Sequence, residues 1–323
     1  MPYLIGIDEA GYGPNLGPLV VSASLWEVPD GTDDDDLYQR LEAVIAPSTQ
    51  RAFGNLNGRV AVADSKLLYK PGGGLRNLER GIWTALSIVG RKPDSWRDVW
   101  NVLAPESAHW LPAIPWYADY DSAAPLDADP AELAPLATAV REGLAAADVR
   151  LLDLRSRAVF PQRFNDLVRE HDSKGAALSH VTLELAARLM EPLDEQPITV
   201  TCDKHGGRNR YAPLLAEHFP ERLIEIRGEG RAQSVYRFGP PERRVEFRFR
   251  AKGESSLAAA LASMASKYLR ELAMRAFNAF WCRRVPGLRP TAGYPQDAKR
   301  FKADIVARQK ELGIEDRVLW REK

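Results

Sequence analysis

Cysteine is scarce in this chain of 323 residues, which contains only Cys202 and Cys282. Two cysteines cannot build a disulfide framework or a thiolate zinc site, so we expect a reducing, cytoplasmic compartment and two small buried side chains. Long apolar runs are also missing, and none approaches the roughly 20 residues that a membrane span requires. The first eight residues lack the basic start and apolar stretch of a signal peptide. We therefore expect a cytoplasmic protein without membrane spans.

An excess of charge of either sign is absent as well, because 44 basic residues balance 44 acidic ones. The balance hides an asymmetry along the chain, since residues 203–323 hold 26 Lys and Arg against 15 Asp and Glu. Arginines crowd the stretch 208–252 with aromatic residues between them, a pattern that suits a phosphate backbone. The alternative is an exposed strand face whose arginines are solvated. Charge alone does not decide between the two.

Strands mixed with helices, without an internal repeat, indicate an α/β fold. The expected strands are 3–8, 19–28, 60–63, 150–160, 198–202, 223–227, 233–238 and 245–250, and the expected helices are 75–89, 161–170, 175–190, 209–219, 254–280 and 296–312. Residues 91–129 are rich in Trp and Pro without a clean period, and we expect them to pack through their aromatic side chains. The four aspartates from Asp33 to Asp36 are expected to form a solvated loop without function.

Four carboxylates stand where an expected strand or helix begins or ends. Asp8 and Glu9 close the first strand, Asp203 closes a later one, and Glu254 opens the long helix. The ends of neighbouring strands can converge on one rim of an α/β sheet, where ligand sites form. Adjacent strand residues point to opposite faces, so Asp8 and Glu9 share a site only if the strand breaks there. The glycine-rich turn that follows is expected to supply that break.

Carboxylates held close together repel one another by roughly 3 kcal/mol per pair at 5 Å when the effective dielectric constant is near 20. Such a cluster is stable with cations inside it. Hard oxygen ligands without His or Cys favour Mg²⁺ or Mn²⁺ over zinc, and two such ions can activate water and stabilise a leaving oxygen. The four acids together indicate a metal-dependent phosphoryl-transfer enzyme. Each acid taken singly is more typical of a helix cap or a surface carboxylate.

The order of motifs along the chain resembles a known family. Residues 6–23, GIDEAGYGPNLGPLVVSA, closely resemble the opening motif of the type-two ribonuclease H family, which comprises ribonucleases HII and HIII. Residues 63–67, ADSKL, are similar to its D-S-K motif, and residues 251–255, AKGES, are similar to its K-G-D-S motif. The strand that ends in Asp203 and the GYP segment at 293–295 are similar to two further family segments.

This resemblance implies a ribonuclease H-like fold, in which a central mixed sheet is flanked by helices. It also implies a single domain over residues 1–323, with insertions at about 27–59, 91–150 and 205–250, and a monomer is expected. The implied activity is endonucleolytic hydrolysis of the RNA strand of an RNA·DNA hybrid, with two Mg²⁺ or Mn²⁺ ions. The implied catalytic and metal-binding residues are Asp8, Glu9, Asp203 and Glu254.

The resemblance also implies which residues bind the nucleic acid. Gly11 and Gly13 would present backbone groups to a ribose 2′-OH, the group that distinguishes RNA from DNA. Tyr294 would pack against a sugar next to the cut, and His205 could shuttle a proton or be an incidental loop histidine. The full set of implied substrate-binding residues is Gly11, Tyr12, Gly13, Lys66, Lys252, Ser255 and Tyr294.

Two residues depart from the family pattern. Tyr12 stands where Arg or Lys is usual, which removes a phosphate-binding cation from the turn. Glu254 stands where Asp is usual, and its extra methylene moves the carboxylate by about 1.5 Å. These departures leave two alternatives open. One is a nucleic-acid-binding relative with weak or lost catalysis, and the other is a nuclease of the same fold with a different substrate, such as branched DNA.

Overall fold

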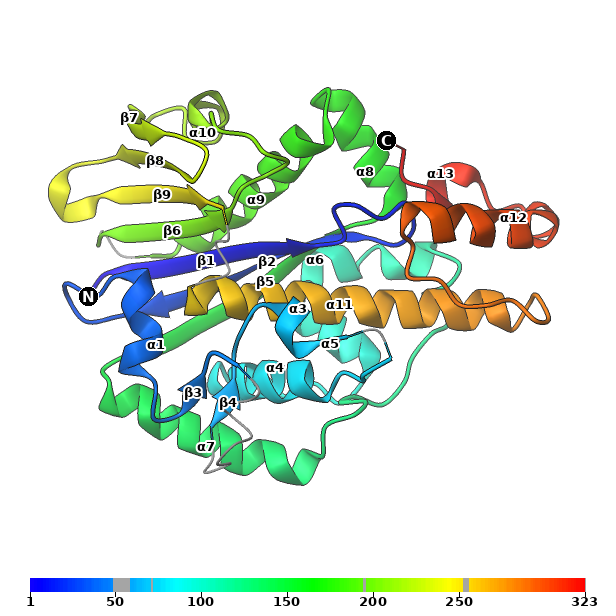
Figure 1. The fold of residues 1–323 in the computed structure, drawn as a ribbon, viewed down its shortest axis with the longest axis horizontal. Coiled ribbons are helices and arrows are strands. Elements are labelled where there is room, and N and C mark those ends of the chain that lie inside the picture. Colours follow the sequence, from blue (N-terminus) through cyan, green and yellow to red (C-terminus); the bar gives the residue numbers. More distant parts are fainter. Residues whose placement is uncertain (49–58, 71, 194–195, 252–255, 323) are drawn as a thin grey trace.

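The computed structural model describes residues 1–48, 59–70, 72–193, 196–251 and 256–322, and a seven-stranded sheet forms its centre (Figure 1). The strand order is β5-β2-β1-β6-β9-β8-β7. The bounds are β1 Tyr3–Ala10, β2 Leu19–Glu27, β5 Arg150–Val159, β6 Ile198–Asp203, β7 Glu225–Glu229, β8 Gln233–Phe238 and β9 Val245–Arg250. The sheet is mixed, because β1 is antiparallel to β2 but parallel to β6. The predicted α/β fold with a central mixed sheet flanked by helices is confirmed.

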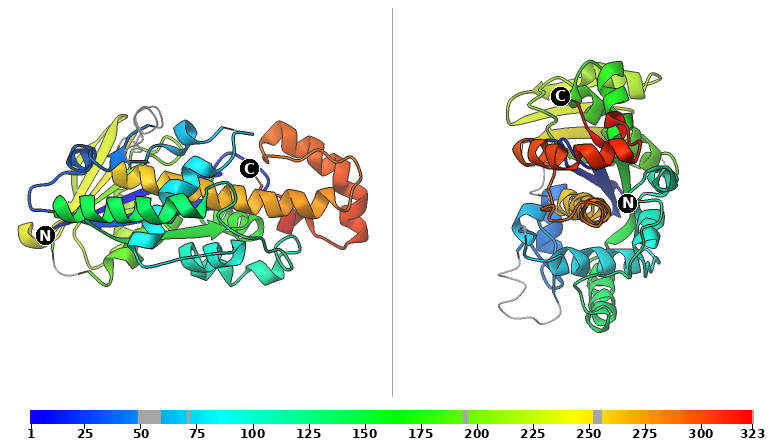
Figure 2. Two further views of the ribbon diagram at one scale, coloured as in Figure 1. Left: turned by 90° about the horizontal axis from the view of Figure 1, so that it is seen from below. Right: turned by 90° about the vertical axis from the view of Figure 1, so that its right-hand side faces the viewer.

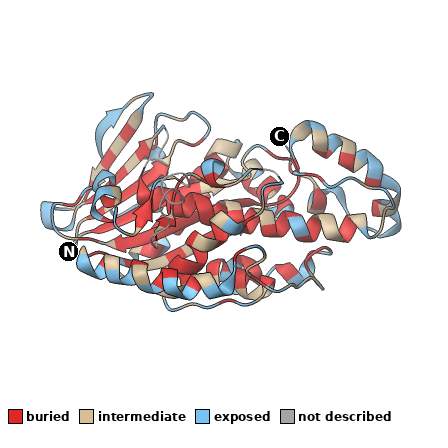
Figure 3. Ribbon diagram, turned by 60° about the horizontal axis from the view of Figure 1, so that its bottom comes forward, coloured by how far each residue is buried: buried red, intermediate tan, exposed pale blue. Residues whose placement is uncertain are grey.

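Both faces of the central strands are buried, and the alternation of side chains along β1 separates them. Ile5 and Ile7 belong to the core beneath α9 (Lys174–Met190), whereas Leu4 belongs to the core beneath α11 (Leu257–Cys282). We call these two sides of the sheet the α9 face and the α11 face. Figure 3 shows that the buried residues concentrate in the strands and on the inner sides of the helices. An α/β sheet covered on both faces leaves the strand ends as the place for a site.

Strand β1 and helix α11 approach each other closely at Gly6. A Cβ atom on Gly6 would lie 2.1 Å from the carbonyl carbon of Ala258 and 2.6 Å from the Ala258 Cβ atom. Hydroxyls satisfy the polar backbone groups nearby, because Ser24 donates to the carbonyl of Ala258 and Ser266 donates to the carbonyl of Asp8. The absence of a side chain at Gly6 therefore fixes how near the helix lies to the strand that carries Asp8.

Replacement of Gly6 by alanine is expected to lower the free energy of unfolding by about 1–3 kcal/mol, because the added methyl group overlaps the backbone of α11. The matched control is Gly228→Ala, since nothing lies within 4 Å of a Cβ atom added there. Urea denaturation of both variants measures the difference. Equal stabilities of the two variants would contradict this packing.

The segments between β2 and β5 pack around α11 and against β5 (Figure 2). Their elements are α1 Leu37–Arg40, β3 Ile45–Ala46, β4 Val60–Ala61, α3 Ser65–Leu68, α4 Arg76–Ile88, α5 Trp96–Leu103, α6 Pro105–Ala108 and α7 Pro130–Ala146. Helix α4 packs against α11, and α7 packs against α4. The aromatic packing predicted for 91–129 is confirmed by mutual ring contacts of Trp96, Trp100 and Tyr117. The sequence pattern does not predict α7, whose many alanines give little amphipathic contrast.

The last segment of the chain returns to the turn that follows β1. The remaining elements are α8 Pro161–Glu170, α10 Ala212–His218, α12 Pro295–Glu311, α13 Asp316–Leu319 and the 3₁₀ turns Asp34–Asp36, Leu111–Ala113 and Pro241–Arg243. Leu16 forms an isolated antiparallel bridge with Trp320, and the N–H of Arg321 donates to the carbonyl of Asn15.

Among the helices of the described ranges, none combines the length and the apolar character needed to cross a membrane.

Candidate active site at the ends of strands β1 and β6

The carboxyl ends of β1 and β6 lie side by side and bring two of the predicted acids together (Figure 1). The two strands are parallel, and Ile7 is the register partner of Cys202. Both of these residues belong to the core on the α9 face, so the next residue on each strand, Asp8 and Asp203, points to the α11 face. Asp8 is buried and Asp203 is half-buried. Two carboxylates thus occupy neighbouring positions on one face of the sheet.

The expected strand break at Asp8 is wrong, because β1 continues through Ala10, which pairs with Val20 of β2. The chain turns only at Gly11, whose φ of +90° lies in the left-handed region. Glu9 therefore projects from the face opposite to Asp8. Its charge still interacts with both aspartates. Burial, followed by the charges of Asp8 and Asp203, raises the pKa of Glu9 to about 8.

Three of the predicted residues, Lys252, Glu254 and Ser255, lie outside the described residues. Within the described ranges, no group of three or more His, Cys, Asp or Glu side chains is arranged so that it could hold a metal ion. The chemistry of the described acids nevertheless fits Mg²⁺ or Mn²⁺, because Asp8, Glu9 and Asp203 offer only hard oxygen ligands. Burial is the largest cause of the raised pKa of Glu9, and the charges of Asp8 and Asp203, which a divalent cation would compensate, add to it.

Lys66 lies within electrostatic reach of this acidic cluster. The segment Asp64-Ser65-Lys66 docks on α11, because the N–H of Ser65 donates to the Ser263 hydroxyl at 3.3 Å. The Lys66 ammonium lies 3.7 Å from a carboxylate oxygen of Asp64, and its side chain is 78% exposed. Its positive charge lowers the pKa of Glu9, against the larger effect of burial. The arrangement leaves an exposed cation close to the carboxylates.

Two buried arginines hold the turn that contains Gly11, Tyr12 and Gly13. Arg270 donates to the carbonyls of Pro18, Leu16 and Ala292, and Arg321 donates to the carbonyl of Tyr12. Neither arginine is among the predicted site residues. The signal for Arg270 in the sequence is a charged residue on the apolar side of a long helix, whereas nothing in the sequence around Arg321 indicates its burial. Glycines give this turn many accessible backbone conformations, and these hydrogen bonds restrict it to one.

Tyr294 joins the same turn from the C-terminal part of the chain. The carbonyl of Gly293 accepts hydrogen bonds from the N–H groups of Asn15 and Leu16 at 2.8 and 3.3 Å. Tyr294 itself is 58% exposed at the start of α12. An ordinary half-buried tyrosine would pack into the core, whereas this ring is available to a ligand beside the Gly11–Gly13 turn.

His205 is a core histidine and not a proton carrier at neutral pH. Its side chain is 2% exposed, and its Nδ1 atom lies 2.9 Å from the Ser179 hydroxyl. Burial, followed by the charge of Arg208, lowers the pKa of His205 to about 3. The ring is therefore neutral across the physiological range, which removes the predicted alternative of a proton shuttle.

The expectation of a solvated loop at Asp33 to Asp36 fits the exposed Asp33, Asp35 and Asp36, but it is wrong for Asp34. Residues Asp34–Asp36 form a 3₁₀ turn, and the side chain of Asp34 is 1% exposed. Asp33 forms an ion pair with Arg248, and Asp35 forms one with Arg250 at 2.8 Å. Burial raises the pKa of Asp34 to about 6, and the nearby hydroxyl groups of Thr201 and Ser256 act in the opposite direction. Part of the arginine-rich stretch is thus neutralised by the chain's own aspartates and is not a free phosphate-binding surface.

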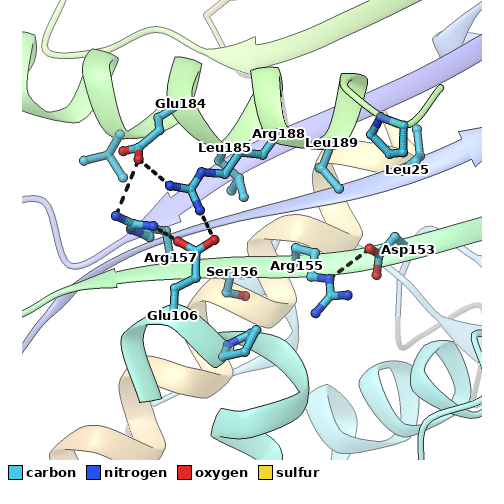
Figure 4. A pocket seen from close by; sticks show the side chains of 13 residues that line it. Leu25, Glu106, Asp153, Arg155, Ser156, Arg157, Glu184, Leu185, Arg188 and Leu189 are labelled. Carbon is cyan, nitrogen blue, oxygen red and sulfur yellow. Dashed lines mark hydrogen bonds and ion pairs between the residues drawn. The ribbon is translucent and has the colours of Figure 1, made fainter. Parts of the chain in front are cut away.

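A cavity of about 380 Å³ lies between β5, α6 and α9, away from the predicted site residues (Figure 4). Four of its lining residues form a closed ring of ion pairs, in which Arg157 and Arg188 each contact Glu106 and Glu184. The other charged residues of its lining are one acid and one base, so the positive and negative groups balance. Such a lining tethers α6 to α9 and favours neither an anion nor a cation.

Glu106→Gln is expected to lower the free energy of unfolding by less than about 1 kcal/mol, because exposed ion pairs contribute little. Leu185→Ala in the same cavity is expected to lower it by about 2 kcal/mol or more, since Leu185 is buried in the core. Thermal or urea unfolding of the two variants measures both values. A larger loss in Glu106→Gln than in Leu185→Ala would show that the ion-pair ring dominates this region.

Comparisons with known proteins give structural similarities but no sequence match. No family model matches the chain, and no curated protein matches it by sequence. The chain is similar to the structure of the PCNA:RNase HII complex from Archaeoglobus fulgidus, with 14% identity and a TM-score of 0.42 over 99% of this chain and 94% of that chain. It is similar to ribonuclease H2 from Pyrococcus horikoshii OT3, with 15% identity and a TM-score of 0.45 over 98% and 92% of the two chains. It is also similar to Bst-RNase HIII in complex with Mn²⁺, with 16% identity and a TM-score of 0.41 over 99% and 66%.

Proposed function

We propose that this chain is a divalent-metal-dependent endonuclease of the ribonuclease H type, which hydrolyses the RNA strand of RNA·DNA hybrids. The observation that carries the proposal is the parallel register of β1 and β6, which places Asp8 and Asp203 side by side on one face of the sheet. Glu9 adds a third carboxylate, whose pKa is raised by burial and by these two neighbours. The motif residues Gly11, Lys66 and Tyr294 supply further support.

In this proposal, Asp8 and Asp203, together with Glu254, hold two Mg²⁺ or Mn²⁺ ions, and Glu9, which projects from the opposite face of the strand, adds negative charge beside them. The ions would supply activation of the attacking water and stabilisation of the leaving oxygen. The carboxylates bind the ions and position them. Glu9 gives up its proton when a cation compensates the charge of its neighbours. Lys66 attracts a phosphate of the substrate. The task of the protein is to hold these groups in place before the nucleic acid arrives.

The turn after β1 is proposed to face the ribose of the cleaved strand. Arg321 holds the carbonyl of Tyr12, so the backbone around Gly11 and Gly13 is fixed for contact with a 2′-OH. The exposed ring of Tyr294 is placed to pack against a neighbouring sugar. Lys252 and Ser255 are proposed to bind further phosphates. We also propose that residues 1–323 act as one domain, as a cytoplasmic monomer whose two cysteines are free thiols.

Cleavage assays on three substrates test this function. A long RNA·DNA hybrid, a DNA duplex with one ribonucleotide and plain DNA are incubated with the protein in Mg²⁺ or Mn²⁺, with EDTA as the control. We expect cleavage of the hybrid in either metal, no cleavage of plain DNA, and weak cleavage at the single ribonucleotide because Tyr12 supplies no cation to the turn.

Two outcomes would favour the alternatives. A salt-dependent mobility shift of the hybrid without product in either metal would identify a nucleic-acid-binding relative without catalysis. Cleavage of branched DNA with an intact hybrid would identify a nuclease of the same fold with another substrate. The alternatives rest on Tyr12 and Glu254, the two residues that depart from the family pattern.

A further inference from the structure

A second cavity, of about 450 Å³, lies directly beyond the ends of β1 and β6. Three segments far apart in sequence line it: Tyr12 from the turn after β1, residues 173–175 at the start of α9, and residues 205–208 after β6. Tyr12 follows Glu9 by three residues, and His205 follows Asp203 by two. The cavity therefore adjoins the candidate active site.

The charge of this cavity is positive, unlike that of the cavity beside α6. Among the described residues that line it, Lys174 and Arg208 are cations and none is an Asp or Glu. His205 also lines it and is neutral, because its pKa is lowered by burial. The cavity opens at the N-terminus of α9, a helix of 17 residues, whose dipole adds positive partial charge.

Arg208 is a half-buried cation in the lining of this cavity. Its Nε atom is buried and has no hydrogen-bond partner. No carboxylate of the described chain forms an ion pair with Arg208, in contrast to Arg248 and Arg250 on β9. A buried guanidinium nitrogen without a partner is unfavourable unless an anion or water satisfies it.

Tyr12 lines the cavity, and its hydroxyl lies close to two glycines of the other lining segments. A Cβ atom on Gly206 would lie 2.7 Å from the Tyr12 hydroxyl, and one on Gly175 would lie 3.7 Å from it. Burial and the charge of Glu9 raise the pKa of Tyr12, and the charge of Arg208 lowers it. The hydroxyl is thus a neutral hydrogen-bond donor that lies within electrostatic reach of both Glu9 and Arg208.

We propose that this cavity binds a backbone phosphate of the nucleic acid, with Lys174 and Arg208 as the cations and the Tyr12 hydroxyl as a further donor. The site rests on the proposed function, because it takes a phosphodiester of the same substrate next to the cleavage point. In this site Arg208 supplies a cation near Tyr12, which itself carries no charge. It also assigns a role to the loop after β6, which the sequence motifs leave without one.

The test measures hybrid binding by fluorescence anisotropy as a function of salt, in EDTA so that nothing is cut. Arg208→Ala and Lys174→Ala are each expected to reduce the slope of log K against log salt by about 1 and to weaken binding at low salt by about tenfold. Arg208→Lys, which keeps the charge, is expected to retain the wild-type slope. Arg141→Ala on α7 is the matched control and is expected to leave the slope unchanged.

Neutral methylphosphonate linkages, placed in one strand at a time, identify which strand fills the cavity. With the correct strand neutralised, wild type and Arg208→Ala bind alike. The site is refuted if Arg208→Ala and Lys174→Ala keep the wild-type salt slope, or if neither neutralised strand removes the difference. Reduced slopes in a protein that cuts no substrate would remove the nuclease proposal and leave the phosphate site standing.

Discussion

Replacement of Asp8 by asparagine is expected to reduce cleavage of an RNA·DNA hybrid by on the order of 10³-fold. Asparagine has nearly the same shape, but it loses the negative charge that a divalent ion requires at this position. Asp8 is buried beside Asp203, so no other carboxylate has room to move into its place in the Asp8→Asn variant. Initial rates in Mg²⁺ and in Mn²⁺, at saturating hybrid, measure the effect on turnover.

Binding of the hybrid in EDTA should change little in Asp8→Asn, because the phosphate contacts are made by other residues. A suitable control is Asp304→Asn, since Asp304 lies on α12 and forms an ion pair with Arg300 at 3.1 Å. Asp304→Asn is expected to cleave like the wild type. Turnover of Asp8→Asn within a few-fold of the wild type would remove Asp8 from the catalytic set.

The second large effect is on stability, and it has the opposite sign. Glu9→Gln is expected to stabilise the metal-free protein, because Glu9 keeps its proton up to about pH 8 in the folded chain, against an ordinary pKa of 4.5. An acid whose pKa is raised on folding stabilises the fold at low pH and opposes it as the pH rises. The window therefore runs from pH 4.5 to pH 8. The expected gain from Glu9→Gln grows to about 2 kcal/mol at pH 6 and about 4 kcal/mol at pH 8.

Thermal unfolding of wild type and Glu9→Gln at several pH values, in EDTA, measures this gain. Glu132→Gln is the matched control, because ion pairing with Arg76 lowers the pKa of Glu132, and its neutralisation brings no gain. Saturating Mg²⁺ should stabilise the wild type more than Glu9→Gln, since the ion binds the folded acids. A gain that does not change between pH 5 and pH 8 would show that Glu9 is not held protonated by its neighbours.

The sequence predicts the sheet well because most of its strands are either largely apolar, as β1 and β2 are, or alternate between apolar and polar residues. β8 and β9 lie at 233–238 and 245–250 as expected, since their alternating apolar residues match a core on one face. The end of β1 was less predictable. Gly11 marks the turn, but the pairing of Ala10 with Val20 extends the strand past Asp8 and turns Glu9 to the other face. Local pattern indicates a strand end only to within a few residues.

Contacts across long sequence separations account for the rest. The burial of Asp34 depends on its place beside Thr201 and Ser256, and its acidic neighbours pair with Arg248 and Arg250, more than two hundred residues away. An acidic run without its partners has the composition of a solvated loop. The phosphate cavity likewise joins Tyr12, the start of α9 and Arg208, which no local spacing connects. The sequence motifs thus indicate the acidic residues of the candidate site. Which arginines and lysines lie near them depends on the fold and is not visible in the local sequence.

The most direct test of the central claim is the binding of Mn²⁺ itself, measured by electron paramagnetic resonance or calorimetry without nucleic acid. We expect wild type to bind two Mn²⁺ ions, and we expect Asp8→Asn and Asp203→Asn each to weaken this binding by about tenfold or more. Unchanged Mn²⁺ affinity in both variants would contradict a metal site at the ends of β1 and β6.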